Sequence, residues 1–224
     1  MSTTPHQEAP GIIFDLDGTL VDTLDDITES INVLFEQQNI ARVSRDRVRA
    51  LIGWGLKNLL LKASGIDDAG RVLQLVEGYR SVYSRRMLNH IRIYPGVPEM
   101  LDQLTVMCTP IAVLSNKPDE FTVPMCHSVL GRWEFVACQG AQSEEDRKPN
   151  PIKALEYARR MGRSASQVFF VGDSATDAQT AHNAGMTSVA VAWGYRDRSE
   201  LESAKPDYLI DDPSQIPQIL RRMK

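Results

Sequence analysis

The chain has 224 residues, of which 42% are hydrophobic, and its 25 basic and 29 acidic residues leave a net charge of −4. The charges are mixed along the sequence, so we expect no surface for nucleic acid and no polybasic membrane anchor. No apolar run reaches the roughly 18 residues that a membrane-spanning helix needs, so we expect no membrane span. The length suits one α/β domain with a smaller appendage.

The cysteines and the N-terminal residues indicate the cellular setting. Cys108, Cys126 and Cys138 show no C-x-x-C spacing and lie in or beside apolar segments, which is typical of reduced, buried thiols in a cytoplasmic protein. Residues 1–10 are polar and lack an apolar core segment, so we expect a loose tail and not a signal peptide. The expected assembly is a monomer or a homodimer.

The first apolar run, residues 11–14, predicts a buried strand that ends in two aspartates, Asp15 and Asp17. Gly18 and Thr19 follow directly. Open α/β sheets place their active sites at such strand ends. An Asp-Gly pair is also a common turn signal, so this segment alone leaves both interpretations open.

Helical periodicity replaces the strand pattern between residues 22 and 89. Four helices are expected there, and the residues that would precede or cap them are Asp22 or Thr23, Ser44, Gly55 and Asp68. We therefore predict a helical cap domain over 22–89, inserted after the first strand. The catalytic core would comprise 1–21 and 90–224, with hinges near 20–23 and 89–95.

Strands and helices alternate in the rest of the chain. Strands are expected at 111–117, 135–138, 168–173, 187–192 and 208–210, and helices at 98–104, at 119–130, after Asn150-Pro151 and before Gly185. Pro124 predicts a late start or a kink in the helix at 119–130. Apolar strands that alternate with helices predict an α/β fold with a Rossmann-like parallel sheet, covered on both faces.

Polar side chains follow several of these strands and would meet at one edge of a parallel sheet. They are Asp15 with Asp17, Ser115 with Asn116, Lys148, and Asp173 with Asp177. Clustered carboxylates repel one another unless a cation lies among them. Because Mg²⁺ prefers oxygen ligands, Asp15, Asp17 and Asp173 are the expected metal site.

The remaining polar residues at this edge suit a phosphoryl group. Lys148 supplies a positive charge, while Ser115 and Asn116 supply short hydrogen-bond donors. Taken singly, each has a simpler interpretation: Ser115 or Asp177 as a cap or turn residue, and Lys148 as a solvated charge. Their joint placement at strand ends favours function.

Four segments resemble, in order and spacing, the motifs of the haloacid dehalogenase superfamily. They are residues 15–19, Ser115-Asn116, Lys148-Pro149, and Gly172-Asp173-Ser174 through Asp177. The helical insertion resembles the cap type of that superfamily placed after the first motif. This resemblance implies a Mg²⁺-dependent phosphomonoester hydrolase that acts on a small phosphorylated metabolite through an aspartyl-phosphate intermediate.

The resemblance also implies roles for the site residues. Asp15 would attack phosphorus, Asp17 would act as general acid and base, and Mg²⁺ would be held by Asp15, the Asp17 backbone carbonyl and Asp173. Ser115, Asn116 and Lys148 would hold the phosphoryl oxygens. Gly18, Ser174 and Asp177 would support these groups, with Asp177 orienting Lys148 or a metal-bound water, and Thr19 would stabilise the loop by a hydroxyl hydrogen bond or contact substrate.

Within the superfamily, residues 53–57 and 115–118 resemble the phosphoglycolate phosphatases, which makes 2-phosphoglycolate the expected substrate. Ser115 replaces a more usual threonine, and Trp54 is bulkier than the usual small polar residue at its position. The alternatives are a phosphatase of another small sugar phosphate or nucleotide, or a phosphosugar mutase. A phosphoacceptor signalling domain is disfavoured by the order of the motifs.

The loop Gly53-Trp54-Gly55 and the nearby Lys57 are the expected contacts for the part of the substrate beyond the phosphate. Lys57 and the free amides that begin the next helix could bind a substrate carboxylate. The alternative is that Trp54 is an exposed aromatic residue and Lys57 a solvated charge.

Overall fold

The computed structural model describes residues 9–222, and its centre is a six-stranded parallel sheet. The strand order is β5-β4-β1-β6-β7-β8. The strands are β1 (Gly11–Phe14), β4 (Ile111–Pro118), β5 (Ala137–Ala141), β6 (Val168–Gly172), β7 (Thr187–Val191) and β8 (Tyr208–Ile210). The predicted α/β class with a parallel sheet is confirmed.

Strand β1 lies in the middle of the sheet, between β4 and β6. Ile13 pairs with Ala112 on one side and with Phe170 on the other, and all four residues of β1 are buried. Apolar side chains fill both faces of such a strand, which explains its unbroken apolar run. Because the three strands are parallel and in register, their carboxyl ends lie next to one another.

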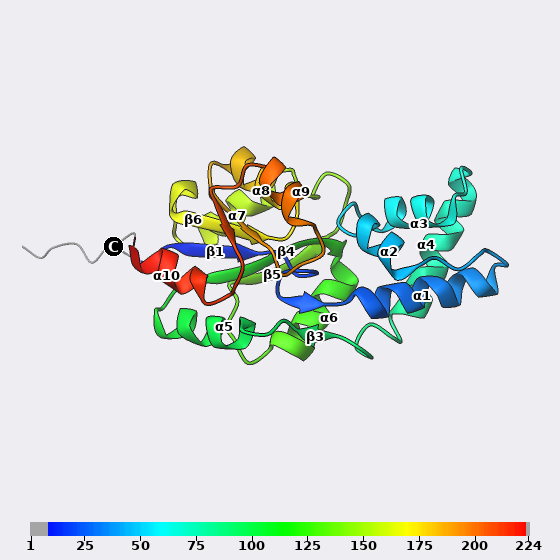
Figure 1. Cartoon of the computed structure of the whole chain (residues 1–224), viewed down its shortest axis with the longest axis horizontal. Helices are drawn as coiled ribbons and strands as arrows, with labels where there is room; N and C mark the ends of the chain where they lie inside the picture. Colours follow the sequence, from blue (N-terminus) through cyan, green and yellow to red (C-terminus); the bar gives the residue numbers. More distant parts are fainter. Residues whose placement is uncertain (1–8, 223–224) are drawn as a thin grey trace, which may run out of the picture.

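Helices cover both faces of the sheet (Figure 1). One face carries α5 (Val97–Val106), α6 (Asp119–Leu130) and α10 (Gln215–Arg222), and the other carries α7 (Ile152–Arg160) and α8 (Ala175–Ala184); the short α9 (Arg198–Ser203) follows β7. Alternate residues of β1 point to opposite faces. Ile12 and Phe14 accordingly belong to one apolar cluster and Ile13 to the other.

Four helices between residues 24 and 83 follow one another in the sequence and lie together at one end of the molecule (Figure 1). They are α1 (Leu24–Gln37), α2 (Arg45–Leu51), α3 (Leu56–Ser64) and α4 (Ala69–Tyr83). Ser44 caps α2 by accepting a hydrogen bond from the Arg47 amide (3.2 Å), and Asp68 caps α4 in the same way. At α1 the Asp22 carboxylate, and not the Thr23 side chain, accepts a bond from the Leu24 amide (3.0 Å).

The chain enters and leaves this helical segment through two short strands that the sequence analysis missed. Strand β2 (Val21–Asp22) pairs with β3 (Arg92–Ile93) in antiparallel orientation. A two-residue strand is too short to show a period-2 pattern in the sequence. The pairing joins the two connections that were expected to act as hinges.

Helix α6 spans Asp119–Leu130, as predicted. Pro124 does not delay its start, because Pro124 and Glu120 are both exposed and solvent can bind the carbonyl that proline leaves without a donor. Two other predicted boundaries were wrong. Strand β5 covers Ala137–Ala141 and not 135–138. Helix α7 begins at Ile152, whose amide donates to Asn150 Oδ1 (3.0 Å), so Pro151 precedes the helix.

Between residues 9 and 222 no helix combines the length and the apolar character needed to cross a membrane. Cys108, Cys126 and Cys138 are free thiols; Cys126 is buried as predicted, but Cys138 is only partly buried and Cys108 is exposed. The expected N-terminal tail falls mainly on residues 1–8, which lie outside the described residues.

Candidate active site

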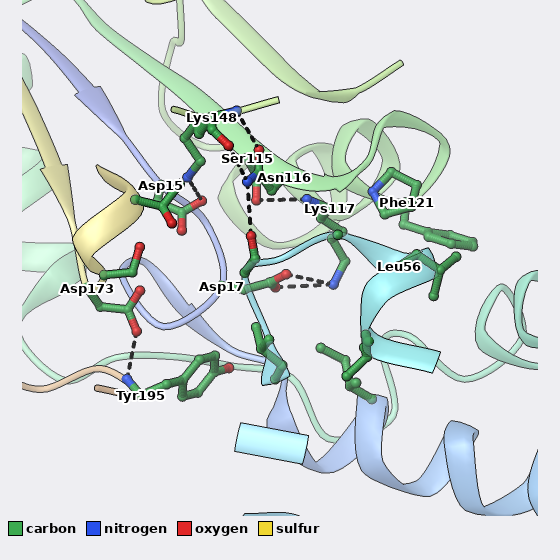
Figure 2. Close-up of a pocket in the computed structure, with 18 of the residues that line it drawn as sticks. Asp15, Asp17, Leu56, Ser115, Asn116, Lys117, Phe121, Lys148, Asp173 and Tyr195 are labelled. Carbon is green, nitrogen blue, oxygen red and sulfur yellow. Dashed lines mark hydrogen bonds and ion pairs between the residues drawn. The ribbon is translucent and has the colours of Figure 1, made fainter. Parts of the chain in front are cut away.

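A cavity opens at the carboxyl edge of the sheet, between the strand ends and the helical segment α1–α4 (Figure 2). Its polar wall, formed by strand ends, loops and the start of α8, includes Asp15, Asp17, Ser115, Asn116, Lys117, Lys148, Asp173, Ser174, Thr176 and Arg196. Its apolar wall, formed mainly by helices, includes Ile27, Ile52, Leu56, Leu59, Tyr79, Tyr83 and Phe121. The strand-end residues singled out in the sequence therefore meet in one place.

Lys148 lies at the centre of a buried group of charges. Its ammonium nitrogen is 2.8 Å from Asp15 Oδ1 and 2.6 Å from Asp177 Oδ1. Burial alone would lower the pKa of Lys148, but the two carboxylates raise it above its ordinary value, so the ammonium stays charged. The structure thus brings Asp177 to Lys148, one of the two contacts that the resemblance implies for Asp177.

Asp177 is itself fixed at the start of α8. Its Oδ2 accepts hydrogen bonds from the backbone amide (3.1 Å) and the hydroxyl (2.6 Å) of Ser174. This is a capping box, in which the first and fourth residues of a helix start satisfy each other's polar groups. The helix start therefore holds Asp177 in place for its contact with Lys148.

Three buried carboxylates, those of Asp15, Asp173 and Asp177, each offer an oxygen within 4.8 Å of the other two. Burial raises the pKa of Asp15 to about 6, although Lys148 opposes this. Burial, with the charges of Asp15 and Asp177, raises the pKa of Asp173 to about 8. Such crowded hard oxygens suit a divalent cation, whose charge would relieve their repulsion.

Backbone atoms pack closely against Asp173. Its Oδ2 accepts a bond from the Tyr195 amide (2.7 Å). Gly18 has φ of +84°, and a Cβ at this position would lie 2.2 Å from the same oxygen. Only glycine fits both the backbone angle and the space. Gly18 therefore allows the loop after β1 to approach the candidate metal site.

Thr19 lies beside this loop but not in the cavity wall. Its hydroxyl is buried and has no hydrogen-bond partner among the described residues, so the predicted hydroxyl bond is absent. The loop is held by its backbone: the Thr19 amide donates to Leu16 O (3.3 Å), and the Thr19 carbonyl accepts from Trp193 Nε1 (3.0 Å). A turn can be closed by either kind of bond, and the sequence does not distinguish them.

Asn116 and Ser115 both line the cavity, but their side chains have different surroundings. The Asn116 amide group donates to Gly53 O (2.9 Å) and to Lys148 O (3.1 Å), and its Oδ1 accepts from the Lys148 amide (2.8 Å). This side chain therefore joins the loop before α3 to the loop that carries Lys148. The Ser115 hydroxyl makes one long contact, accepting from the Lys117 amide at 3.4 Å.

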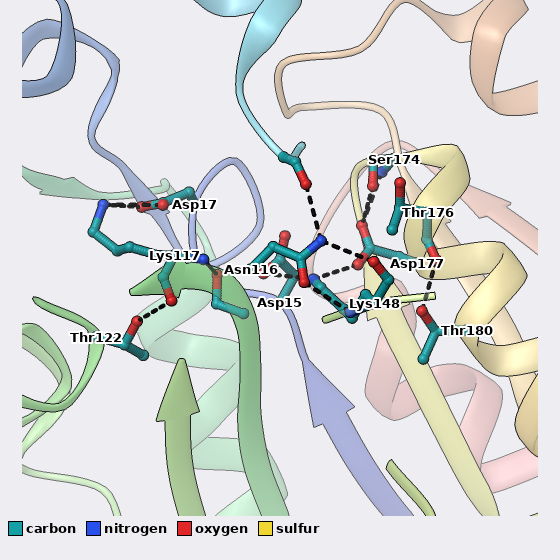
Figure 3. Close-up of polar contacts among 12 residues, drawn as sticks. Asp15, Asp17, Asn116, Lys117, Thr122, Lys148, Ser174, Thr176, Asp177 and Thr180 are labelled. Atoms are coloured by element: carbon teal, nitrogen blue, oxygen red, sulfur yellow. Dashed lines mark hydrogen bonds and ion pairs between the residues drawn. The ribbon is translucent and has the colours of Figure 1, made fainter. Parts of the chain in front are cut away.

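Asp17 points away from Asp15 and toward Lys117 (Figure 3). The Lys117 ammonium is 3.0 and 3.2 Å from the two oxygens of Asp17, and Asp17 also accepts from the Thr23 hydroxyl (2.7 Å). No role for Lys117 was predicted from the sequence, although this residue follows Ser115 and Asn116 at the end of β4. Its pairing with a residue 100 positions away leaves no local sequence signal.

The two glycines of the loop before α3 line the cavity, whereas the tryptophan between them lies at the surface. Gly53 and Gly55 line the cavity, and a Cβ at Gly55 would lie 2.5 Å from Arg147 Cζ. Trp54 is 55% exposed and faces a second opening beside Arg147. Lys57 is exposed and is not among the residues that line the cavity, a placement expected of a solvated charge.

Arg196, which the sequence analysis also missed, fastens the loop after β7 to the helical segment. Its guanidinium donates to the carbonyl oxygens of Arg49 (2.7 Å) and Ile52, and Arg49 Nε donates back to the Tyr195 carbonyl. These bonds close one side of the cavity. Single arginines outside a motif give no signal of such long-range contacts.

Known proteins resemble this chain along most of its length. The haloacid dehalogenase-like hydrolase family matches residues 12–191. A phosphoglycolate phosphatase of Pseudomonas syringae pv. syringae (strain B728a) is 34% identical over 209 residues, which cover 90% of this chain and 76% of that protein. Its counterpart in Haemophilus influenzae (strain 86-028NP) is 32% identical over 215 residues, covering 92% and 96%.

The fold is shared with solved structures as well. The crystal structure of a protein from Haemophilus somnus 129PT, described as a predicted phosphoglycolate phosphatase, superposes with a TM-score of 0.87 at 30% identity and covers 96% of this chain and 99% of that one. The predicted superfamily and the predicted hydrolase class are confirmed. The chain belongs to the haloacid dehalogenase-like hydrolase family.

Proposed function

We propose that this hydrolase is a Mg²⁺-dependent phosphatase that cleaves 2-phosphoglycolate through a phosphorylated Asp15. The observation that carries the proposal is the buried group of Asp15, Asp173, Asp177 and Lys148 at one side of the cavity. The curated relatives named phosphoglycolate phosphatase support the phosphoric monoester hydrolase class and this substrate. The free thiols agree with a cytoplasmic setting.

The donor set fits Mg²⁺. Asp15 and Asp173 would hold the ion together with the Asp17 backbone carbonyl, and the raised pKa values of both carboxylates indicate the charge repulsion that a cation would remove. When bound, the ion would neutralise charge on the phosphoryl oxygens. Asp177 belongs to the same oxygen cluster, but both of its oxygens already have donors.

Asp15 would attack phosphorus and the ester oxygen would leave, so that the phosphoryl group becomes bound to the carboxylate. The Lys148 ammonium would stabilise the negative charge on the phosphoryl oxygens during this transfer, since it lies 2.8 Å from the Asp15 carboxylate that attacks. The buried Ser115 hydroxyl has only one weak contact and can donate to the same oxygens. Water would release phosphate from Asp15 in a second step.

Asp17 would give a proton to the leaving oxygen and later take one from the attacking water. To do so its carboxylate would turn from Lys117 toward Asp15, two residues earlier in the same segment. Thr23, at the junction with the helical segment, holds the carboxylate in its present direction. Movement of that segment is therefore linked to the direction of Asp17.

Residues 22–89 would act as the cap over this site. Their side of the cavity is apolar, and closure over the phosphoryl group would exclude water from the charges inside. Asn116 would help to hold the cap in its closed position, because its side-chain amide donates a hydrogen bond to the carbonyl of Gly53 in the cap loop.

Phosphate release from a panel of small phosphoesters, with Mg²⁺ and with a chelator, tests the proposal. We expect 2-phosphoglycolate to be the preferred substrate, without any bisphosphate activator, and activity to be lost in the chelator. Labelled substrate should mark Asp15, and Asp15→Asn should abolish both the label and turnover. A label on another residue, or a requirement for a bisphosphate, would contradict the mechanism.

A further inference from the structure

The cavity wall contains three cations, Lys117, Lys148 and Arg196, and two of them are fully engaged. Lys148 is held between Asp15 and Asp177. Arg196 donates to two backbone carbonyls and its Nε lies 3.2 Å from Glu200. A second anionic group on a substrate, in addition to its phosphate, therefore needs another positive charge.

Lys117 is the remaining cation and its surroundings suit such a group. Its side chain is only 4% exposed, and within residues 9–222 its one ionic partner is Asp17. The ammonium also lies 4.8 Å from the ring centre of Tyr83. A buried ammonium between one carboxylate and an aromatic face is weakly solvated, so it would attract a further anion strongly.

The aromatic residues around Lys117 form a firm wall and add one free donor. Tyr83 stacks on Tyr79 with ring centres 5.1 Å apart and meets Phe121 edge-on at 5.0 Å. The Tyr83 hydroxyl is buried and has no hydrogen-bond partner within residues 9–222. A buried donor without a partner is costly, and an oxygen of a bound ligand would satisfy it.

We propose that Lys117 determines specificity by binding a carboxylate on the leaving-group side of the substrate. The inference rests on the proposed phosphatase function and adds the residue that recognises the substrate beyond phosphorus. Figure 3 shows the two lysines on opposite sides of Asn116: Lys148 with Asp177 on one side, and Lys117 with Asp17 on the other. A molecule with a phosphate at one end and a carboxylate at the other would pair with both lysines.

Exchange of partners at Lys117 would also free Asp17. A substrate carboxylate that pairs with the ammonium competes directly with the contacts at 3.0 and 3.2 Å that now hold Asp17 away from Asp15. Asp17 could then turn toward the leaving oxygen. An ester without the second anion would leave the Lys117–Asp17 pair intact and would be cleaved more slowly.

The test compares two esters of nearly equal size, 2-phosphoglycolate and 2-hydroxyethyl phosphate, which differ in one carboxylate. In the wild-type protein kcat/KM should be higher for 2-phosphoglycolate. Lys117→Met should reduce this preference by about 10- to 150-fold, the effect of one charge-assisted hydrogen bond, mainly through KM for 2-phosphoglycolate. The matched control is Lys153→Met, since Lys153 pairs with Glu156 on α7 outside the cavity.

Because Lys117→Met leaves Asp17 buried without its partner, its folding is checked by thermal unfolding, and Lys117→Arg provides a second variant that keeps the charge. Lys117→Arg should retain most of the preference for 2-phosphoglycolate. Equal losses on both esters, or a wild-type protein without any preference, would overturn the role of Lys117. A wild-type protein that releases phosphate from neither ester would instead overturn the proposed function on which this role depends.

Discussion

Asp177 could act on Lys148 or bind the metal ion, and Asp177→Asn separates these roles. One carboxylate oxygen contacts Lys148 at 2.6 Å, and the other accepts two bonds from Ser174. The same carboxylate lies within 4.8 Å of oxygens of Asp15 and Asp173. Since both oxygens already have donors, we expect the main role to be the positioning of Lys148.

The expected loss follows from the contact that the substitution weakens. An amide has nearly the shape of the carboxylate but no charge, so Asp177→Asn removes one charge-assisted hydrogen bond worth about 1.5 to 3 kcal/mol. At saturating Mg²⁺ we expect kcat/KM for 2-phosphoglycolate to fall about 10- to 150-fold. The assay is phosphate release measured over a wide range of Mg²⁺ concentrations.

The dependence on Mg²⁺ decides the question. If raised Mg²⁺ restores full activity to Asp177→Asn, then Asp177 acts as a metal ligand and our assignment to Lys148 is refuted. Ser174→Ala is the matched comparison, because it removes only the hydroxyl bond of 2.6 Å to the same carboxylate. Because the acceptor is a carboxylate, this bond is also charge-assisted, and the lower end of the range for such bonds, about 1.5 kcal/mol, predicts a loss of about tenfold.

Four further outcomes are expected. Asp17→Asn should slow alkyl phosphates much more than aryl phosphates, because poor leaving groups need a general acid; equal losses would contradict this. Mg²⁺ affinity, measured by calorimetry, should rise with pH up to about 8, because the raised pKa of Asp173 lets the metal-free protein hold a proton that the ion displaces. The metal-free protein should lose stability as the pH rises from about 4 to 8, because Asp173 binds this proton more tightly in the folded than in the unfolded state. Gly18→Ala should raise the Mg²⁺ needed for half-maximal activity at least about tenfold, because the new Cβ displaces Asp173. Lys57→Ala should change KM for 2-phosphoglycolate by less than about threefold, because an exposed charge in water contributes little.

The sheet and most of the site could be predicted from local patterns. The apolar run of β1 ends at Asp15 and that of β6 ends at Asp173, and parallel pairing brings such ends together whatever the details of packing. Helix caps such as Ser44 and Gly185 also carry local signals that the structure bears out. These features depend on neighbours in the sequence or on the topology alone.

The features that escaped prediction depend on side-chain contacts between distant segments. The side chain of Asn116 makes hydrogen bonds to the backbones of two other loops, and no sequence pattern around residue 116 predicts them. Lys117 pairs with Asp17, and Arg196 bonds the carbonyls that end α2. Each contact joins segments that are far apart in the sequence and meet only in the folded protein: β4 with the residues after β1 at Lys117, and the loop after β7 with α2 at Arg196.

Lys57 and Lys117 show how burial decides what a lysine near a motif can do: Lys57 was the predicted substrate contact, and Lys117 was not. Both stand near motifs, yet Lys57 is exposed on α3, whereas the Lys117 side chain is 4% exposed and paired inside the cavity. Water screens the first charge, and the second keeps most of its attraction for an anion. Lys57→Ala and Lys117→Met, assayed on 2-phosphoglycolate and 2-hydroxyethyl phosphate, therefore form one experiment. A large selective loss in Lys57→Ala with none in Lys117→Met would mean that the carboxylate is recognised at the start of α3, and that the cavity closes in a way that brings Lys57 inward.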